Sequence, residues 1–148
     1  MNKLLATDDS WSSLIVRFGL GLAIFPHGMQ KLLGWFGGPG FSGTMRYLSG
    51  MMHVPAWLAV VVILAESLGS IGLIVGCLTR VAAFSIVCDM IGAVYLVHWH
   101  NGFFMNWSGR QAGEGFEYHI LAAAIGVALM IAGGGRWSLD RLLVSRRH

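Results

Sequence analysis

Six side chains that can transfer protons lie at the ends of long apolar segments of the sequence. They are His27, Lys31, His98, His100, Glu117 and His119. Imidazole titrates near pH 6.5 and so gives or takes protons at physiological pH. A quinol headgroup needs hydrogen-bond partners at its two oxygens, and proton acceptors when it is oxidised. We therefore predict that one membrane face holds a site for a quinone headgroup or its protons. The predicted ligand-binding residues are His27, Lys31, His98 and Glu117.

These histidines have two other interpretations. Interfacial histidines that only hydrogen-bond lipid headgroups or loop carbonyls remain an open alternative. A metal site has less support, because His98 and His100 are two residues apart and point about 200° away from each other on a helix. The sequence also has no H-E-x-x-H motif or similar pair of ligands four residues apart. We predict no metal site.

Three charged residues interrupt the apolar segments themselves, namely Arg17, Glu66 and Asp89. Each such charge costs about 2.5–3.5 kcal/mol at the centre of a membrane helix, so all three are expected to face the protein interior and find partners. Small residues share the helical face of each charge, and small residues let helices approach closely in lipid. The sequence therefore predicts a buried charge network.

The role of this network has two interpretations. In the structural one, Arg17 clamps Glu66 or Asp89 and fixes which helices pair. In the functional one, a single cation is too few for two carboxylates, and the surplus carboxylate holds a proton, relays protons or binds a polar headgroup. The surplus acid favours the functional interpretation. An Arg17 side chain that extends to the membrane surface would weaken both.

Composition predicts the kind of protein that must position these residues. The chain has 148 residues, of which 55% are hydrophobic and 11% charged, with a mean hydropathy of +0.66. A soluble domain carries about 25% charged residues, so this chain cannot cover a globular surface with polar groups and is too apolar to be disordered. The net charge of +3 comes without a basic helix interleaved with aromatics, which argues against a nucleic-acid partner. We predict one integral membrane domain over residues 1–148.

Four apolar segments approach the length of about 20 residues that a membrane-spanning helix needs. They cover residues 11–33, 56–76, 80–98 and 117–135. The predicted fold is all-α, a four-helix transmembrane bundle. The two long connections, about 34–55 and 99–116, are rich in glycine and aromatic residues, and we expect outer loops there.

The distribution of Lys and Arg predicts the orientation, because cytoplasmic flanks carry the excess of these residues. With both termini in the cytoplasm, the inner side carries Lys3, Arg80, Arg136, Arg141, Arg146 and Arg147, and the outer side carries Lys31, Arg46 and Arg110. The outer side also gathers Trp35, Trp57, Trp99 and Trp107, which is typical of an aromatic belt. The basic tail, residues 136–148, is expected to lie on the inner surface as a short amphipathic helix.

Several segments, taken in order, resemble the DoxX family of small bacterial membrane proteins. The matching segments are RFGLGLAIFPHGMQKL (17–32), FGGPGF (36–41), ESLGSIGLIVGCLTR (66–80), HWHNGFF (98–104), GEGFEY (113–118) and GGGRWSLD (133–140). The individual positions that match are Arg17, His27, Gly28, Lys31, Glu66, Arg80, His98, Gly102, Phe103 and Glu117. The resemblance implies a four-helix membrane bundle linked to quinol oxidase, thiosulfate:quinone oxidoreductase or redox-defence assemblies.

We therefore predict a multi-pass protein of the bacterial inner membrane that serves as a subunit of a quinone-linked oxidoreductase or a membrane redox-defence complex. No motif for haem or flavin is present, so no covalently bound cofactor is expected, quinone is the candidate cofactor, and electrons must come from a soluble or membrane partner protein. Whether the chain alone is an enzyme is left open. Two alternatives stand beside this prediction: a non-catalytic carrier of a small molecule or lipid, and a scaffold that recruits soluble redox enzymes through the basic tail. Glycine-rich helix faces allow oligomers without demanding them.

Overall fold

Helices make up all the regular structure in the computed structural model, which describes residues 2–145, and no strand occurs among these residues. The long elements are α2 (Trp11–Leu33), α4 (Ala56–Val75), α5 (Thr79–Ala93) with its extensions η3 (Val94–His98) and η4 (Trp99–Asn101), and α6 (Glu117–Ala132). The short elements are α1 (Asn2–Leu5), η1 (Trp35–Gly37), α3 (Gly40–Met45), η2 (Arg46–Met51) and α7 (Leu139–Ser145). The prediction of an all-α fold is confirmed.

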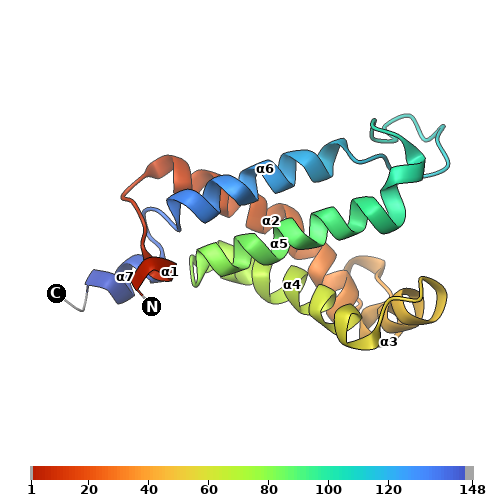
Figure 1. The fold of residues 1–148 in the computed structure, drawn as a ribbon, viewed down its shortest axis with the longest axis horizontal. Helices are drawn as coiled ribbons and strands as arrows, with labels where there is room; N and C mark the ends of the chain where they lie inside the picture. Colours follow the sequence, from red (N-terminus) through yellow and green to blue (C-terminus); the bar gives the residue numbers. More distant parts are fainter. Residues whose placement is uncertain (1, 146–148) are drawn as a thin grey trace.

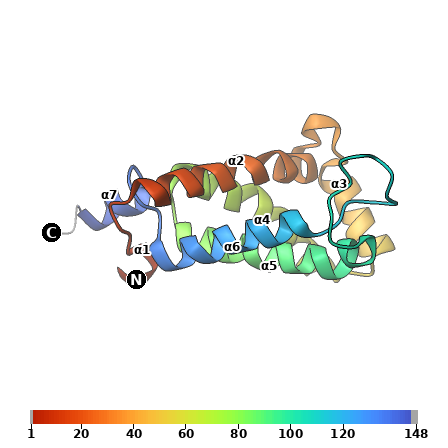
Figure 2. The ribbon, with the colours of Figure 1, turned by 90° about the horizontal axis from the view of Figure 1, so that it is seen from above.

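The four long helices lie side by side and alternate in direction (Figure 1). Helix α2 packs on α4, α4 on α5, α5 on α6, and α6 returns to α2. Both termini, α1 and α7 lie at one end of the molecule, which we call the terminus end. Helix α3 and the loop over residues 102–116 lie at the opposite end, the loop end, as the view from above also shows (Figure 2).

Three of the helical stretches are long and apolar enough to cross a membrane: Trp11–Leu33, Ala56–Val75 and Thr79–Asn101, with mean hydropathies of 1.2, 2.4 and 1.8. The first matches the predicted segment 11–33, and the next two correct the predicted bounds 56–76 and 80–98 by a few residues. Helix α6 is apolar but has only 16 residues. The predicted segment 117–135 is too long at its end, because Gly133 and Gly135 take positive φ angles of 85° and 69° and stop the helix.

The two connections expected to be loops differ from each other. The first, residues 34–55, is largely helical, since it folds into η1, α3 and η2. Its glycine and aromatic residues predict a loop, but Gly34 and Pro39 lie at helix ends, where such residues are favoured. The second is irregular from Gly102 to Phe116, as predicted. At the loop end, one connection is therefore largely helical and the other is irregular.

Glycines on α2 allow a close approach to α4. Gly21 and Gly28 are buried on the face that also carries Arg17 and Ile24. A Cβ atom added to Gly28 would lie 2.7 Å from the backbone of Glu66, a distance that real Cβ atoms do not adopt. This confirms that small residues accompany the buried charges and bring the helix backbones together.

Arginine side chains satisfy the backbone at the terminus end. The guanidinium of Arg17 is 1% exposed and donates to the carbonyls of Leu73 at 2.6 Å, Ile74 at 2.7 Å and Gly134 at 2.8 Å. The last carbonyls of a helix have no partner within the helix, so Arg17 supplies the missing donors for α4. The clamp of Arg17 on Glu66 or Asp89, one of the two interpretations of the network, is therefore wrong, because this guanidinium donates to carbonyls at the terminus end.

Two further side chains complete the terminus end. Arg80 donates to the carbonyls of Met130 and Ile131, both at 2.8 Å, and so caps α6 as Arg17 caps α4. The carboxylate of Asp140, 1% exposed, accepts from the backbone nitrogens of Leu78 and Thr79 at 2.6 and 2.8 Å and caps the start of α5. The tail thus anchors the end of the helix assembly.

The predicted tail helix is present as α7 over Leu139–Ser145. Its basic residues are partly engaged within the chain, because Arg136 and Arg141 both form ion pairs with Asp9. Arg146 and Arg147, two of the basic residues expected on the inner side, lie outside the described residues. The described part of the tail therefore packs on its own chain.

The glycine contact between α2 and α4 generates a stability prediction. We expect Gly28→Ala to lower the free energy of unfolding by about 1–3 kcal/mol, because the added methyl group overpacks the contact with Glu66. Gly19→Ala on the same helix is the matched control, since a Cβ there meets nothing within 4 Å. Thermal and chemical unfolding of the purified proteins in detergent, followed by circular dichroism, measures both. Equal stability of the two variants would contradict the close approach.

Candidate functional site

An ion pair between α2 and α4 forms the centre of the polar interior. Lys31 Nζ donates to Glu66 Oε1 at 2.6 Å and to Glu66 Oε2 at 2.5 Å. The Glu66 side chain is 6% exposed and that of Lys31 is 29% exposed. Because Gly28 brings α2 against the backbone of Glu66, Lys31 lies one turn further along α2 within reach of the carboxylate. The cation that pairs with Glu66 is therefore Lys31.

Asp89 on α5 adds a second carboxylate to this pair. The residue is 8% exposed, lies close enough to Glu66 for the two carboxyl groups to interact, and its Oδ2 atom has no hydrogen-bond partner within residues 2–145. Two carboxylates thus face one ammonium group. The excess of acid over base that the sequence predicted is present, with Lys31 in place of Arg17, and a bound proton or a ligand must balance it.

A cavity of about 690 Å³ opens beside these charges. Its walls come from the end of α2, the α3–η2 segment, α4, α5 and η3, and most of its lining is apolar. Lys31, Glu66 and Asp89 contribute to one wall. Small-molecule sites are commonly clefts of about 300–1,000 Å³ with few polar groups in an apolar lining, and this cavity has that character.

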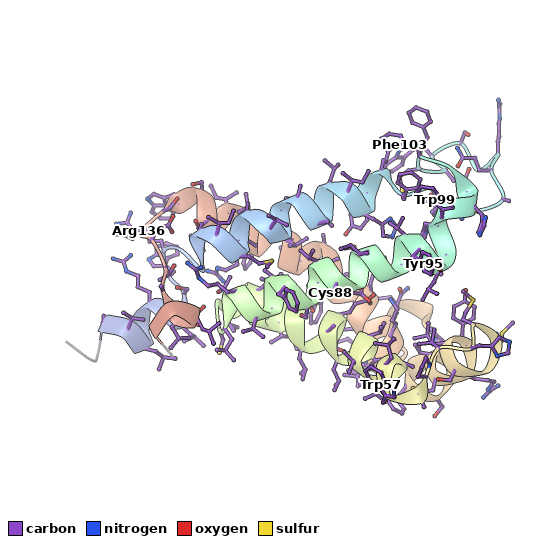
Figure 3. All side chains as sticks on the ribbon, viewed as in Figure 1. Trp57, Cys88, Tyr95, Trp99, Phe103 and Arg136 are labelled. Atoms are coloured by element: carbon purple, nitrogen blue, oxygen red, sulfur yellow. The ribbon has the colours of Figure 1, made fainter. Side chains whose placement is uncertain are left out.

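Side chains not selected from the sequence also line the cavity. Thr44 is buried in α3 and its hydroxyl donates to the carbonyl of Lys31 at 3.2 Å. Ser85 lies one turn before Asp89 on α5, and Cys88 is an exposed thiol (Figure 3). Ser85 shares the helical face of Asp89, so helical spacing could have found it, whereas Thr44 sits in a segment expected to be a loop.

His98 joins the cavity from the end of α5. The residue closes η3, a π-helical segment, and π-helical turns are frequent at functional sites. Its Nδ1 atom lies 2.8 Å from the carbonyl oxygen of Glu114, and its ring centroid lies 4.1 Å from that of His119. His119 is 8% exposed and its Nδ1 atom has no partner within the described residues. The two imidazoles therefore connect the cavity lining to the buried face of α6.

The structure divides the four residues predicted to bind a ligand. Lys31 and His98 line the cavity. His27 is exposed on α2 outside the lining, and the Glu117 carboxylate accepts from the backbone nitrogen of Met105 at 3.2 Å, where it holds the loop over residues 102–116. His100 is exposed as well. Across residues 2–145, no three His, Cys, Asp or Glu side chains are grouped to hold a metal ion.

Exposed tryptophans surround the loop end. Trp57 and Trp99 lie there, whereas Arg136 lies at the terminus end (Figure 3). The predicted belt of Trp35, Trp57, Trp99 and Trp107 is exposed throughout, by 52%, 69%, 63% and 86%. Trp99 also stacks on Phe116 with ring centroids 5.6 Å apart, which ties η4 to the start of α6.

Comparison with known proteins finds one matching family model and several similar membrane proteins. The sequence profile described as DoxX matches residues 12–99. An uncharacterized membrane protein of Mycobacterium tuberculosis is 28% identical over 97% of this chain and 88% of its own length. The protein named "Putative oxidoreductase CatD" of Bacillus subtilis is 26% identical over 79% of this chain and 77% of its own. The inner membrane protein YqjF of Escherichia coli is 29% identical over 74% and 79%. No solved structure matches the chain significantly.

The ion pair generates a prediction that separates pairing from burial. We expect Lys31→Met to lower the free energy of unfolding by about 3 kcal/mol, because it leaves the Glu66 carboxylate buried without its cation. The double variant Lys31→Met with Glu66→Met should recover part of this loss. Arg110→Met, which removes an exposed cation of the loop, is the control and should change stability little. Additive losses in the double variant, measured by unfolding in detergent, would contradict the pairing.

Proposed function

The chain belongs to the DoxX family and is a membrane protein, and on this basis we propose that it is the membrane subunit of a quinone-linked oxidoreductase or of a membrane redox-defence complex. The observation that carries the proposal is the apolar cavity with Lys31, Glu66 and Asp89 on one wall. A quinone combines a polar ring with an apolar tail, and the cavity combines the same two environments.

The ring of the quinone lies against the charged wall in this proposal. Carboxylates and imidazole accept and release the protons that accompany quinone chemistry. The apolar tail leaves between α4 and α5, where Val61 and Phe84 line the cavity and are 50% and 55% exposed on the outside of the helices. Electrons come from a partner protein, and the name of the Bacillus subtilis relative, a putative oxidoreductase, is consistent with a redox role.

A carrier that binds a lipid or small molecule without redox chemistry is the second candidate, because the same cavity supports it. The discriminating observation is electron transfer. Oxidation or reduction of the quinone by membranes that contain the protein and its native partners supports the first function, and saturable binding without such a reaction supports the carrier.

We also propose that α6 crosses the membrane with the three longer helices, which makes a four-helix transmembrane bundle. Helix α6 begins at the loop end and finishes at the terminus end, so it returns the chain to the side from which α2 starts (Figure 1). Its 16 residues span about 24 Å, a little less than the hydrocarbon core of about 30 Å. The terminus end then faces the cytoplasm and the loop end faces outward.

Binding of decylubiquinone to the purified protein tests the proposed site. We expect saturable binding that slows alkylation of Cys88 by a maleimide in a Cys77→Ala background, because Cys88 lines the cavity. Glu66→Gln should strengthen binding of this oxidised ring at least about tenfold, since it frees the Lys31 ammonium to donate to a quinone carbonyl.

Glu114→Gln is the matched control, because its carboxylate accepts from the backbone of Asn106 and does not line the cavity. Circular dichroism confirms that each variant is folded. Absence of saturable binding to the unaltered protein, or equal affinities of the Glu66 and Glu114 variants, would reject the cavity as the quinone site.

Reporter fusions test the proposed orientation. A green fluorescent protein fused after the last residue should fluoresce in bacterial cells, and alkaline phosphatase at the same position should be inactive, because the positive-inside rule places the terminus end in the cytoplasm. Alkaline phosphatase inserted after Gly109, in the irregular loop, should be active. The opposite pattern would reverse the orientation.

A further inference from the structure

The hydrogen-bond donors along the polar lining of the cavity are mostly engaged within the protein. The Lys31 ammonium donates two of its three N–H groups to the oxygens of Glu66. The hydroxyls of Thr44 and Ser85 donate to the carbonyls of Lys31 and Ala82, at 3.2 and 2.8 Å. The side-chain amide of Gln30 donates one of its two hydrogens to the carbonyl of Phe36 at 3.3 Å. The free donors that a ligand meets here are the third N–H group of Lys31, the second amide hydrogen of Gln30, the Tyr47 hydroxyl and the weakly donating Cys88 thiol.

The acceptors are in surplus on the same lining. The carboxylate of Asp89 is more than nine-tenths buried and its Oδ2 atom has no partner in the described part of the chain. A carboxylate offers about four lone-pair sites, so Glu66 retains acceptor capacity beyond its two bonds with Lys31.

His98 adds an acceptor at another part of the lining. Its Nδ1 atom lies against the carbonyl oxygen of Glu114, which can only accept, so Nδ1 carries the hydrogen. With the hydrogen on Nδ1 of a neutral imidazole, the second nitrogen, Nε2, is an acceptor. The charged wall and His98, which both line the cavity, thus carry acceptors.

We propose that the cavity binds the dihydroxy form of its ring headgroup, the hydroquinone, in preference to the dicarbonyl form. A quinone carbonyl only accepts hydrogen bonds, so it leaves Asp89, the spare lone pairs of Glu66 and Nε2 of His98 without donors. The two hydroxyl groups of a hydroquinone can donate to these acceptors, so buried acceptors that would otherwise lack partners become satisfied. The inference rests on the proposed function, because it assigns the reduced state of the ligand to that same site.

Three ring compounds of one skeleton test the preference on the full purified chain in detergent, without oxygen. They are durohydroquinone, its quinone and its dimethyl ether, whose fully substituted rings do not add to the Cys88 thiol. Titration calorimetry should give a dissociation constant for the hydroquinone at least about tenfold below those of the other two, the size expected for a hydrogen bond to a charged group.

Asp89→Asn exchanges a carboxylate oxygen for an NH₂ donor. We expect this variant to bind the hydroquinone more weakly and the quinone more tightly, because a donor replaces an acceptor. The ratio of the quinone dissociation constant to the hydroquinone dissociation constant should fall below about threefold. Asp9→Asn, an exposed aspartate at the terminus end, should leave the ratio unchanged. The three-compound comparison on the unaltered protein decides the question if the Asp89 variant does not fold.

The outcomes separate this inference from the function on which it rests. A quinone or dimethyl ether that binds as tightly as the hydroquinone overturns the preference and leaves the quinone site in place. An unchanged ratio in a folded Asp89→Asn variant also overturns it, because the acceptor would then have no part in the selection. Failure of all three compounds to bind overturns the proposed function and this inference with it.

Discussion

The contact of Gly28 with the backbone of Glu66 is the constraint on which the polar interior depends. Without a Cβ on Gly28, α2 lies against α4 closely enough for Lys31 to reach the Glu66 carboxylate with both oxygens engaged. Helix α5 then brings Asp89 beside the pair. A side chain at Gly28 would widen the α2–α4 gap, and Glu66 would face an apolar surrounding with no cation. The position of the cavity's charged wall therefore follows from one small residue.

The two ends of the helix assembly meet the same requirement in different ways. Polar groups placed in an apolar medium need hydrogen-bond partners, because each group without one costs several kcal/mol of free energy. At the terminus end, Arg17 and Arg80 supply donors for helix carbonyls and Asp140 supplies acceptors for helix nitrogens, so local groups satisfy one another. At the loop end, acceptors around Asp89 exceed the donors supplied by the chain. The first arrangement stabilises the fold, and the second leaves a place for a ligand.

Helical spacing predicted which faces are buried but not which charges meet. Arg17, Glu66 and Asp89 are all buried, as their small neighbours indicated. The partner of Glu66 was missed because periodicity gives the direction of a side chain around a helix and not its height relative to the next helix. In an antiparallel pair, the start of α2 meets the end of α4, so Arg17 reaches Leu73 and Lys31 reaches Glu66. The helices α3 and η2 were missed because glycine-rich sequence favours loops.

The surplus of carboxylate is what makes the loop end suited to a ligand that carries protons. An ion pair with matched charges, or an arginine with all its donors engaged, holds its geometry and gains nothing from a further partner. Two carboxylates beside one ammonium are stable in a low-dielectric cavity only when a proton or a donor makes up the difference. A hydroquinone brings both, because each hydroxyl donates a hydrogen bond on binding and yields a proton on oxidation. The same deficit of donors that selects the reduced ring thus also prepares the site to receive its protons.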